Sequence, residues 1–181
     1  MYKYNIYLLL FSLLSLVACR QKQGNLLKDG NHGMDENINS FFVNMYGDTI
    51  KKVSRTNEEW KSTLNQMEYH VLREHGTESA YSGDLLSNKL EGLYTCRGCG
   101  MPLFGSKHKF DSGTGWPSFF DVLDKRSLII ETDYNLGYAR SGLACRKCGG
   151  HLGHVFEDGP KPTGKRYCIN AVSLDFIKSE N

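Results

Sequence analysis

Two copies of one short motif limit how this chain can fold more than any other feature. They are Cys96-Arg-Gly-Cys99-Gly and Cys145-Arg-Lys-Cys148-Gly. Two residues between the cysteines let both thiolates of a tight turn face one point about 2.3 Å away, and the following glycine permits the positive φ that such a turn needs. Four thiolates from two turns complete a tetrahedral shell with no position for water. We therefore expect Cys96, Cys99, Cys145 and Cys148 to hold one structural metal ion.

Zinc fits this site better than iron because nothing else in the chain indicates electron transfer, although thiolate ligands alone do not separate the two. The alternatives are a thioredoxin-like redox pair and two disulfides. A redox pair is expected once, beside a βαβ pattern, and neither condition holds. The stretch between the motifs is much longer than in a small zinc finger, so the ion should join distant parts of one domain.

The start of the chain has the pattern of an export signal. The apolar run Ile6–Ala18 is too short for a bilayer, which takes about 20 residues, but fits the apolar core of a secretory signal. A buried or membrane-spanning helix is the alternative. The ending Leu16-Val-Ala-Cys19 resembles the lipobox of bacterial lipoproteins, which implies cleavage before Cys19 and lipidation of that cysteine. We expect residues 1–18 to be a signal peptide and the exported protein to be a cell-envelope lipoprotein, anchored to the membrane.

The charge of the chain argues against one class of partner. The formal net charge is +2 and the basic residues are dispersed, whereas a protein that binds nucleic acid usually needs a clustered basic stripe. We expect no nucleic acid partner, and a monomer.

The rest of the chain divides into a spacer and one domain. Residues 19–50 begin with the lipidated cysteine and are polar and glycine-rich as far as about residue 40, which is typical of a flexible spacer. Residues 51–181 are expected to form the domain. Thr56–His75 is its one clear helix, because Thr56 and Glu59 have the spacing of a capping box and Gly76 can end it. The apolar stripe of this helix consists of Trp60, Leu64, Met67, Val71 and Leu72.

From Gly92 onward the sequence favours β-structure. Ser127–Thr132, Leu136–Cys145 and Lys165–Phe176 are β-rich, and glycine or proline clusters separate such segments. We expect a mainly β domain with mostly antiparallel strands and one or two small helices at its N-terminal edge.

Cys168 is the cysteine left over when Cys19 and the four metal ligands are set aside. If its segment is a strand, Arg166, Cys168 and Asn170 share one face. The other face would carry Tyr167, Ile169 and Ala171. The guanidinium would favour the thiolate and lower the pKa of the thiol, and the thiolate is the nucleophile. The alternative is that Cys168 is a small buried apolar residue.

Two further clusters bear on this cysteine. His151 and His154, beside the carboxylate of Asp158, could protonate a leaving oxygen near neutral pH. They could instead be metal ligands or hydrogen-bonded core histidines. The turn Phe110–Phe119 presents Trp116 and could form an apolar slot for a methyl group or thioether, or could be only a well-packed loop.

These clusters, in this order, closely resemble the methionine-R-sulfoxide reductase family, the B-type enzymes. The resemblance runs from about residue 57 to 176 and leaves residues 1 to about 50 outside it. It rests on Gly92-Leu-Tyr-Thr-Cys96 with Cys99, Asp111-Ser-Gly-Thr-Gly-Trp-Pro-Ser-Phe119, Cys145 with Cys148, His151-Leu-Gly-His-Val-Phe156, Asp158-Gly-Pro and Arg166-Tyr-Cys-Ile-Asn170.

The resemblance implies two antiparallel sheets with peripheral helices, a structural zinc ion, and Cys168 as the nucleophile that reduces methionine-R-sulfoxide in proteins or peptides. The thiolate attacks the sulfoxide sulfur, an imidazolium protonates the departing oxygen, and Cys168 becomes a sulfenic acid that a thiol must reduce. Trp116 packs on the substrate methyl, with Phe156 as a second substrate contact. The polar part of the site consists of His151, His154, Asp158, Arg166 and Asn170, and we favour His154 as the proton donor.

One position departs from the family pattern. Many members carry a resolving cysteine in the loop before the tryptophan, and this chain has Thr114 there. We therefore expect an external thiol reductant, a thioredoxin-like protein, to reduce the sulfenic acid directly. A membrane-tethered, zinc-stabilised binding module and a redox sensor without turnover are the alternatives to the enzyme.

Overall fold

The protein is described by a computed structural model that covers residues 40–134 and 137–180. The predicted signal peptide, Cys19 and most of the predicted spacer lie outside these ranges. So does Leu136, the first residue of one predicted β segment. None of the helices in the described ranges is long and apolar enough to cross a membrane.

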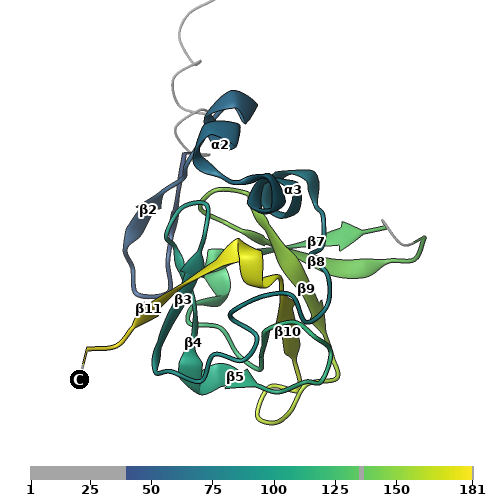
Figure 1. Ribbon diagram of the computed structural model, residues 1–181. Helices are drawn as coiled ribbons and strands as arrows, with labels where there is room; N and C mark the ends of the chain where they lie inside the picture. The colour runs from purple at the N-terminus through teal and green to yellow at the C-terminus, as the bar shows by residue number, and fades with distance from the viewer. Residues whose placement is uncertain (1–39, 135–136, 181) are drawn as a thin grey trace, which may run out of the picture. The chain divides into compact units, whose positions relative to one another are not determined.

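The main sheet has six antiparallel strands, and the described residues form two smaller antiparallel sheets beside it (Figure 1). The order in the main sheet is β5 (Lys109–Phe110), β6 (Ser118–Phe119), β10 (Arg166–Ile169), β9 (His151–Phe156), β8 (Arg140–Cys145) and β7 (Leu128–Asp133). The second sheet is β11 (Leu174–Lys178), β3 (Gly92–Cys96) and β4 (Pro102–Gly105), and the third is the pair β1 (Phe41–Val43) and β2 (Thr49–Lys51). Single turns of 3-10 helix connect some strands: η1 (Ser106–His108), η2 (Lys125–Ser127) and η3 (Ala171–Ser173).

The mainly β class and the antiparallel pairing agree with the expectation from sequence. The number of sheets does not, because three are present in the described residues where two were expected. The additional sheet is the hairpin of β1 and β2. Its turn is fixed to the domain by two hydrogen bonds, from Met45 N–H to Asp124 Oδ2 (2.9 Å) and from Arg126 Nη1 to the Asn44 carbonyl (2.9 Å). Within the described residues, the strand β1 at Phe41–Val43 precedes residue 51, the first residue of the expected domain.

The apolar core lies between the main sheet and the three-stranded sheet. Phe104 of β4 stacks on Phe119 of β6 with ring centroids 4.3 Å apart, and Tyr94 of β3 meets the same ring edge-on at 4.9 Å. Tyr167 and Ile169 of β10 are also buried here. Because side chains alternate along a strand, the other face of β10 is left for Arg166 and Cys168.

The predicted helix is two helices, α2 (Asn57–Thr63) and α3 (Gln66–Glu74). The capping box of Thr56 and Glu59 is present as predicted, but Asn65 and Glu68 form a second one that starts a new helix. Trp60, Val71 and Leu72 are buried as expected. Met67 is exposed, because the break between α2 and α3 interrupts the helical spacing that related it to Trp60 and Leu64. α3 packs against β9 and η3, which places helical structure next to the predicted histidines (Figure 1).

Candidate active site and metal centre

Four cysteine sulfurs converge where the ends of β3 and β8 meet. The Sγ atoms of Cys96, Cys99, Cys145 and Cys148 all lie within 4.8 Å of one another. Cys96 and Cys148 are 3.6 Å apart, as are Cys99 and Cys145, so neither pair is a disulfide, whose sulfurs lie about 2.05 Å apart. A tetrahedron with metal–sulfur bonds of about 2.3 Å has edges of about 3.8 Å, which matches this spacing. The arrangement fits a closed metal site built from four thiolates.

The turns that carry these cysteines have the predicted backbone. Gly100 and Gly149, which follow the two motifs, have φ values of 69° and 71°. Arg73 of α3 donates from Nη1 to the Cys148 carbonyl (3.1 Å), and Lys147 donates from Nζ to the Cys99 carbonyl (3.2 Å). The metal centre therefore joins the two larger sheets and one helix.

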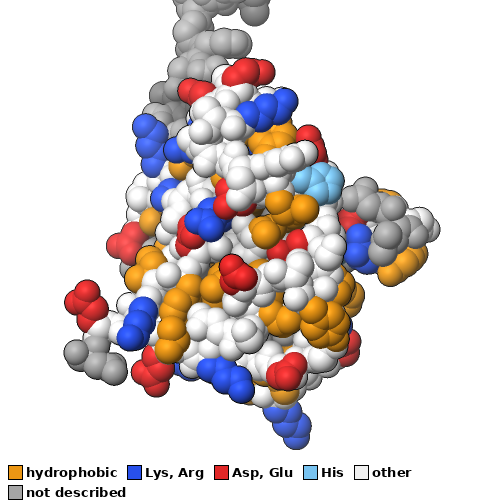
Figure 2. Space-filling view, in the orientation of Figure 1, with side chains coloured by type: hydrophobic (Ala, Val, Ile, Leu, Met, Phe, Trp, Pro, Cys, Tyr) orange, Lys and Arg blue, Asp and Glu red, His pale blue; other side chains and the backbone are white. Residues whose placement is uncertain are grey.

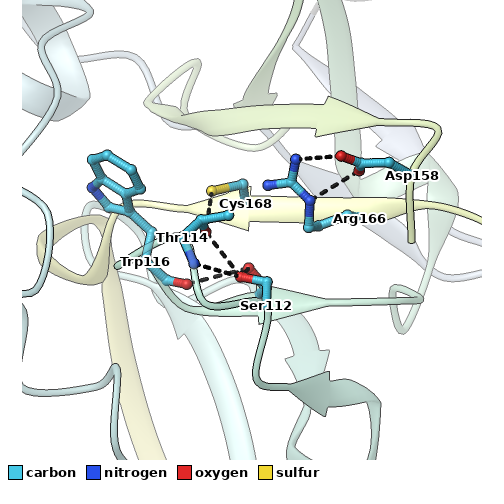
Figure 3. A network of polar contacts seen from close by, with 7 residues as sticks. Ser112, Thr114, Trp116, Asp158, Arg166 and Cys168 are labelled. Atoms are coloured by element: carbon cyan, nitrogen blue, oxygen red, sulfur yellow. Dashed lines mark hydrogen bonds and ion pairs between the residues drawn. The ribbon is translucent and has the colours of Figure 1, made fainter. Parts of the chain in front are cut away.

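Cys168 lies in β10 on the outer face of the main sheet, directly opposite Ser118 of β6 and His154 of β9. Side chains opposite each other in an antiparallel pair share a face, with Cβ atoms about 4.5–5.5 Å apart. Figure 3 shows Cys168 and Arg166 on the same side of their strand, with the indole of Trp116 on the far side of the sulfur. The thiol is half-buried, so it is not the fully enclosed apolar residue of the alternative interpretation.

The loop that contains Trp116 lies over the sulfur. Thr114 Oγ1 is 3.8 Å from Cys168 Sγ and 2.8 Å from Ser112 Oγ (Figure 3). Ser112 Oγ is in turn 2.7 Å from Ser118 Oγ. Trp116 is half-buried and donates from Nε1 to the Glu78 carbonyl at 3.2 Å. The loop thus places a chain of hydroxyl groups and an indole beside the thiol.

A β-bulge brings both predicted histidines to the face that holds Cys168. His154 is opposite Gly142 of β8, whereas His151 is opposite Ala144, so Leu152 is an extra residue. Residues 142 and 144 point to the same face, and the two imidazole centroids are 5.4 Å apart. Gly153 makes the bulge possible: its φ is 155°, and a Cβ there would lie 2.1 Å from the Cys168 carbonyl oxygen.

The two histidines differ in their partners. His154 Nε2 is 2.6 Å from Asp133 Oδ2, and because an ionised carboxylate only accepts, Nε2 carries the proton and Nδ1 is the nitrogen left for a ligand. His151 Nε2 is buried and has no hydrogen-bond partner among the described residues. Asp133 was not predicted as a site residue, although its position at the end of a predicted β segment could have suggested it.

Burial keeps both imidazoles neutral. It lowers the pKa of His151 to about 4 and is also the main cause of a lowered pKa at His154, where Asp133 acts in the opposite direction. The expected imidazolium at neutral pH is therefore not the form that this environment favours. Proton donation from His154 would require a ligand that stabilises the charged ring.

Arg166 connects Cys168 to the two remaining predicted residues of this face. Its Nε and Nη2 donate to both carboxylate oxygens of Asp158 at 2.9 and 2.8 Å, and its Cζ lies 4.3 Å from the centroid of the Phe156 ring. Asp158 is exposed. It orients the guanidinium, and the guanidinium is the group beside the sulfur (Figure 3).

Burial also decides the pKa of the thiol. It raises the pKa of Cys168 above its ordinary value, and the hydrogen bond from Thr114 and the charge of Arg166 offset only part of that rise. The sequence-based expectation of a lowered pKa was wrong, because it counted the neighbouring cation and not the loss of water.

This pKa predicts how the thiol responds to pH in the absence of substrate. The thiolate is the reactive form, so the rate constant for iodoacetamide at Cys168 should rise about tenfold per pH unit from about pH 7 and show no plateau below 9.0. Peptide mass mapping after timed alkylation measures it. Arg166→Gln should move the curve to higher pH. A plateau near neutrality in the unchanged protein would contradict the raised pKa.

Asn170 is not on the strand face expected for it. It follows β10, is buried, and begins η3. Its amide oxygen accepts from Glu78 N–H and its Nδ2 donates to the Leu152 carbonyl, both at 3.1 Å. Glu78 was missed from sequence, since no spacing links it to any motif.

The chain was compared with known protein families and proteins. Residues 64–178 match the family model of the SelR domain. Proteins named peptide methionine sulfoxide reductase MsrB are similar: one from Methanosarcina mazei is 53% identical over 130 residues, covering 72% of this chain and 93% of that protein. One from Thiobacillus denitrificans is 48% identical over 122 residues, covering 67% and 92%. The mouse protein named methionine-R-sulfoxide reductase B3, mitochondrial, is 47% identical over 130 residues, covering 72% of this chain and 51% of its own length. On this similarity, and with four clustered cysteines of the kind described above, the chain belongs to the SelR domain family of MsrB-type peptide methionine sulfoxide reductases.

Proposed function

We propose that this protein reduces methionine-R-sulfoxide in proteins and peptides to methionine, with Cys168 as the nucleophile. The observation that carries the proposal is the placement of one half-buried thiol opposite His154 and beside the Trp116 loop, on one face of the sheet. The similarity to peptide methionine sulfoxide reductases supports the reaction.

In the proposed reaction the Cys168 thiolate attacks the sulfoxide sulfur. The attack joins the Cys168 sulfur to the substrate sulfur. The sulfur–oxygen bond of the substrate then breaks as the protonated oxygen becomes bonded to the Cys168 sulfur as a sulfenic acid, and the sulfur–sulfur bond breaks as methionine leaves as a thioether. Cys168 is oxidised by two electrons and the substrate is reduced by two. Arg166 favours the thiolate, Trp116 packs on the methyl group, and His154 donates the proton that the departing oxygen needs.

The half-buried thiol has a raised pKa, so the reaction needs substrate binding to favour its ionisation. A sulfoxide oxygen beside Nδ1 of His154 would accept a hydrogen bond from the protonated ring and so favour the imidazolium. Both changes favour a thiolate at Cys168 and an imidazolium at His154 once substrate is bound. The site can therefore be neutral without substrate and still perform acid–base chemistry with it.

The assay that tests the function uses the soluble domain, a chemical dithiol and racemic methionine sulfoxide as free amino acid and within a peptide. We expect loss of the R epimer only. Binding of an oxidised peptide without turnover would favour a binding module, and one oxidation of Cys168 without continued product would favour a redox sensor; either result overturns the proposal.

We also propose that the metal is zinc. Four thiolates in a closed tetrahedral arrangement suit it, and the site leaves no open position that catalysis would require. Metal analysis of the purified protein should find one zinc per chain. Stoichiometric iron in place of zinc would contradict this.

We propose further that an external, thioredoxin-like thiol donor reduces the sulfenic acid. Five cysteines occur in the described residues, and four belong to the metal cluster. Thr114 occupies the position beside Cys168 from which a second thiol could act. Among the described residues no further thiol is then free to form an internal disulfide, and Cys19 is expected to carry a lipid, so dimedone should trap the sulfenic acid after one turnover without dithiol.

Thr114→Cys should change that intermediate. The introduced thiol would lie where Thr114 Oγ1 is now, 3.8 Å from Cys168 Sγ, and a small movement of the loop brings the two sulfurs to bonding distance. It would attack the sulfenic sulfur and release water, so dimedone trapping should fall by about tenfold and a disulfide should appear in its place. Thr132→Cys, at an exposed position of β7, is the matched control and should leave trapping unchanged. An undiminished dimedone adduct in the Thr114→Cys protein would show that the loop holds this position out of reach.

Finally, we propose that the protein is exported and anchored by a lipid on Cys19, with residues 1–18 removed and the residues that follow acting as a spacer. The apolar run and the Leu16-Val-Ala-Cys19 sequence support this. Mass spectrometry of the full-length protein from bacterial membranes should find an acylated N-terminus at Cys19, and Cys19→Ser should release the protein from the membrane fraction. A cytoplasmic product that retains Met1 would overturn it.

A further inference from the structure

Glu78 is a carboxylate that the reaction does not use, yet it is 4% exposed and lies next to the site. It stands in the segment that connects α3 to β3, outside any helix or strand. Its carboxylate accepts two backbone hydrogen bonds, from Ala171 N–H at 2.5 Å and from Val172 N–H at 3.1 Å. Both donors belong to η3, which is separated from β10, the strand that carries Cys168, by Asn170 alone.

The main chain of Glu78 makes two more contacts with the site. Its N–H donates to Asn170 Oδ1 at 3.1 Å, and its carbonyl accepts from Trp116 Nε1 at 3.2 Å. Asn170 in turn donates to the Leu152 carbonyl in the bulge of β9. One residue therefore binds the indole, the corner that follows Cys168 and, through Asn170, the strand of the histidines.

In the described residues Glu78 forms no ion pair, and a buried carboxylate without a cation is costly unless hydrogen bonds compensate. Burial raises the pKa of Glu78, and the hydrogen bonds from Ala171 and Val172 act against that rise. The neighbourhood is also tight: a Cβ on Gly83 would lie 2.2 Å from the Ala171 Cβ and 3.2 Å from Glu78 Oε1. The Glu78 side chain is therefore confined between η3 and the backbone at Gly83.

The segment that contains Glu78 lies along the Trp116 loop. Tyr81 N–H donates to the Gly115 carbonyl at 2.8 Å, and Tyr81 Oη donates to the Gly113 carbonyl at 2.7 Å. Tyr81 itself is largely exposed, so apolar burial does little to fix this part of the segment. Polar contacts therefore hold this segment against the Trp116 loop, and the hydrogen bonds of Glu78 with Asn170 and Ala171 are buried.

We propose that Glu78 is a positioning residue that sets the distance between the Trp116 indole and the Cys168 sulfur by tying the Trp116 loop to the corner at Asn170–Val172. The inference deepens the proposed function and rests on it, because it assumes that the gap between indole and sulfur receives the methyl group of the sulfoxide. An apolar slot of fixed width discriminates a methyl thioether from bulkier groups and holds the sulfoxide sulfur in line with the thiolate.

A double-mutant cycle tests this role. Glu78→Gln keeps the size of the side chain but turns an amide N–H toward one of the two backbone donors, so the tie to η3 is weakened. In the otherwise unchanged protein we expect kcat/KM for the R-sulfoxide to fall about tenfold. With Trp116→Phe, which has no indole N–H to position, the same substitution should cost less than about threefold. Glu91→Gln, at an exposed position with no side-chain hydrogen bond or ion pair in the described residues, is the matched control and should leave kcat/KM unchanged.

A role limited to folding predicts a different pattern. Glu78→Gln would then cost the same factor in both backgrounds, and its effect would follow the fall in melting temperature; that result overturns the proposal. If Glu78→Gln does not fold, Glu78→Asp, which keeps the charge and shortens the reach, takes its place in the same cycle.

A measurement without substrate separates this proposal from the proposed function. The chain has two tryptophans, so a spectrum of protein with ¹⁵N-labelled indoles shows two N–H signals, and Trp116→Phe identifies one. Glu78→Gln should shift the Trp116 signal and speed its hydrogen exchange about tenfold, leaving Trp60 unchanged. If the unchanged protein has no reductase activity, the proposed function fails. The Trp116 signal would still show whether Glu78 holds the indole in place. An unmoved signal overturns the positioning role even in an active enzyme.

Discussion

Replacing Cys168 with serine should reduce methionine sulfoxide turnover by about 10³-fold or more, because a hydroxyl oxygen in this half-buried place is a far weaker nucleophile than sulfur and cannot accept oxygen from the substrate. Steady-state assay with dithiol and R-sulfoxide measures the loss. The substitution replaces the Sγ atom by a hydroxyl oxygen next to Thr114 and Ser118, whose side chains are also hydroxyls. The rest of the site should therefore be preserved.

Preservation can be checked on the same protein. Cys168→Ser should keep its metal content and its melting temperature, since the sulfur lies outside the four-cysteine cluster. Substrate binding should survive as well, because the indole and the arginine remain. Turnover above about one hundredth of the unchanged rate would mean that another residue attacks the sulfoxide, and the proposed mechanism would be wrong.

Replacing Cys96 with serine should destabilise the fold by about 4 kcal/mol or more and release the metal. Cys96 is fully buried at the end of β3, and its turn joins β3 to the turn after β8 through the shared ion. Structural zinc sites contribute about 10–16 kcal/mol in small peptides, which is comparable with the about 5–15 kcal/mol that keeps an ordinary domain folded. Metal analysis and thermal unfolding of the purified variant measure both effects.

Cys168→Ser is the matched control for this experiment, because it makes the same chemical change at a cysteine outside the cluster. A strong chelator applied to the unchanged protein should reproduce the effect of Cys96→Ser. A Cys96→Ser protein that binds a full equivalent of metal and unfolds at the unchanged temperature would contradict a structural site made of four thiolates.

The features that could be predicted from sequence are those set by short-range chemistry. Two residues between cysteines and a glycine after them fix the geometry of a turn, and the structure brings the sulfurs together as that spacing requires. The capping box at Thr56 is equally local. Strand alternation correctly separated Cys168 from the buried Tyr167 and Ile169.

The features that could not be predicted depend on long-range packing. Leu64 ends one helix and Asn65 begins the next, and the side chain of Asn65 was not distinguishable from an ordinary polar position in a continuous helix. The direction of the Cys168 pKa depends on how much water the fold removes, which a neighbouring Arg166 does not reveal. Glu78 meets Ala171 across 93 positions of the chain, and nothing in its surroundings along the sequence indicates that partner.

The extra residue in β9 has a consequence for how related chains are compared. His151 and His154 flank Leu152 and Gly153, and only the one-residue surplus relative to β8 turns both rings to the same side. A relative that lost a single position in this tetrapeptide would keep both imidazoles in an alignment while directing one of them into the core. Two aligned histidines therefore indicate the same arrangement of imidazoles in the site only when the two residues between them are also retained.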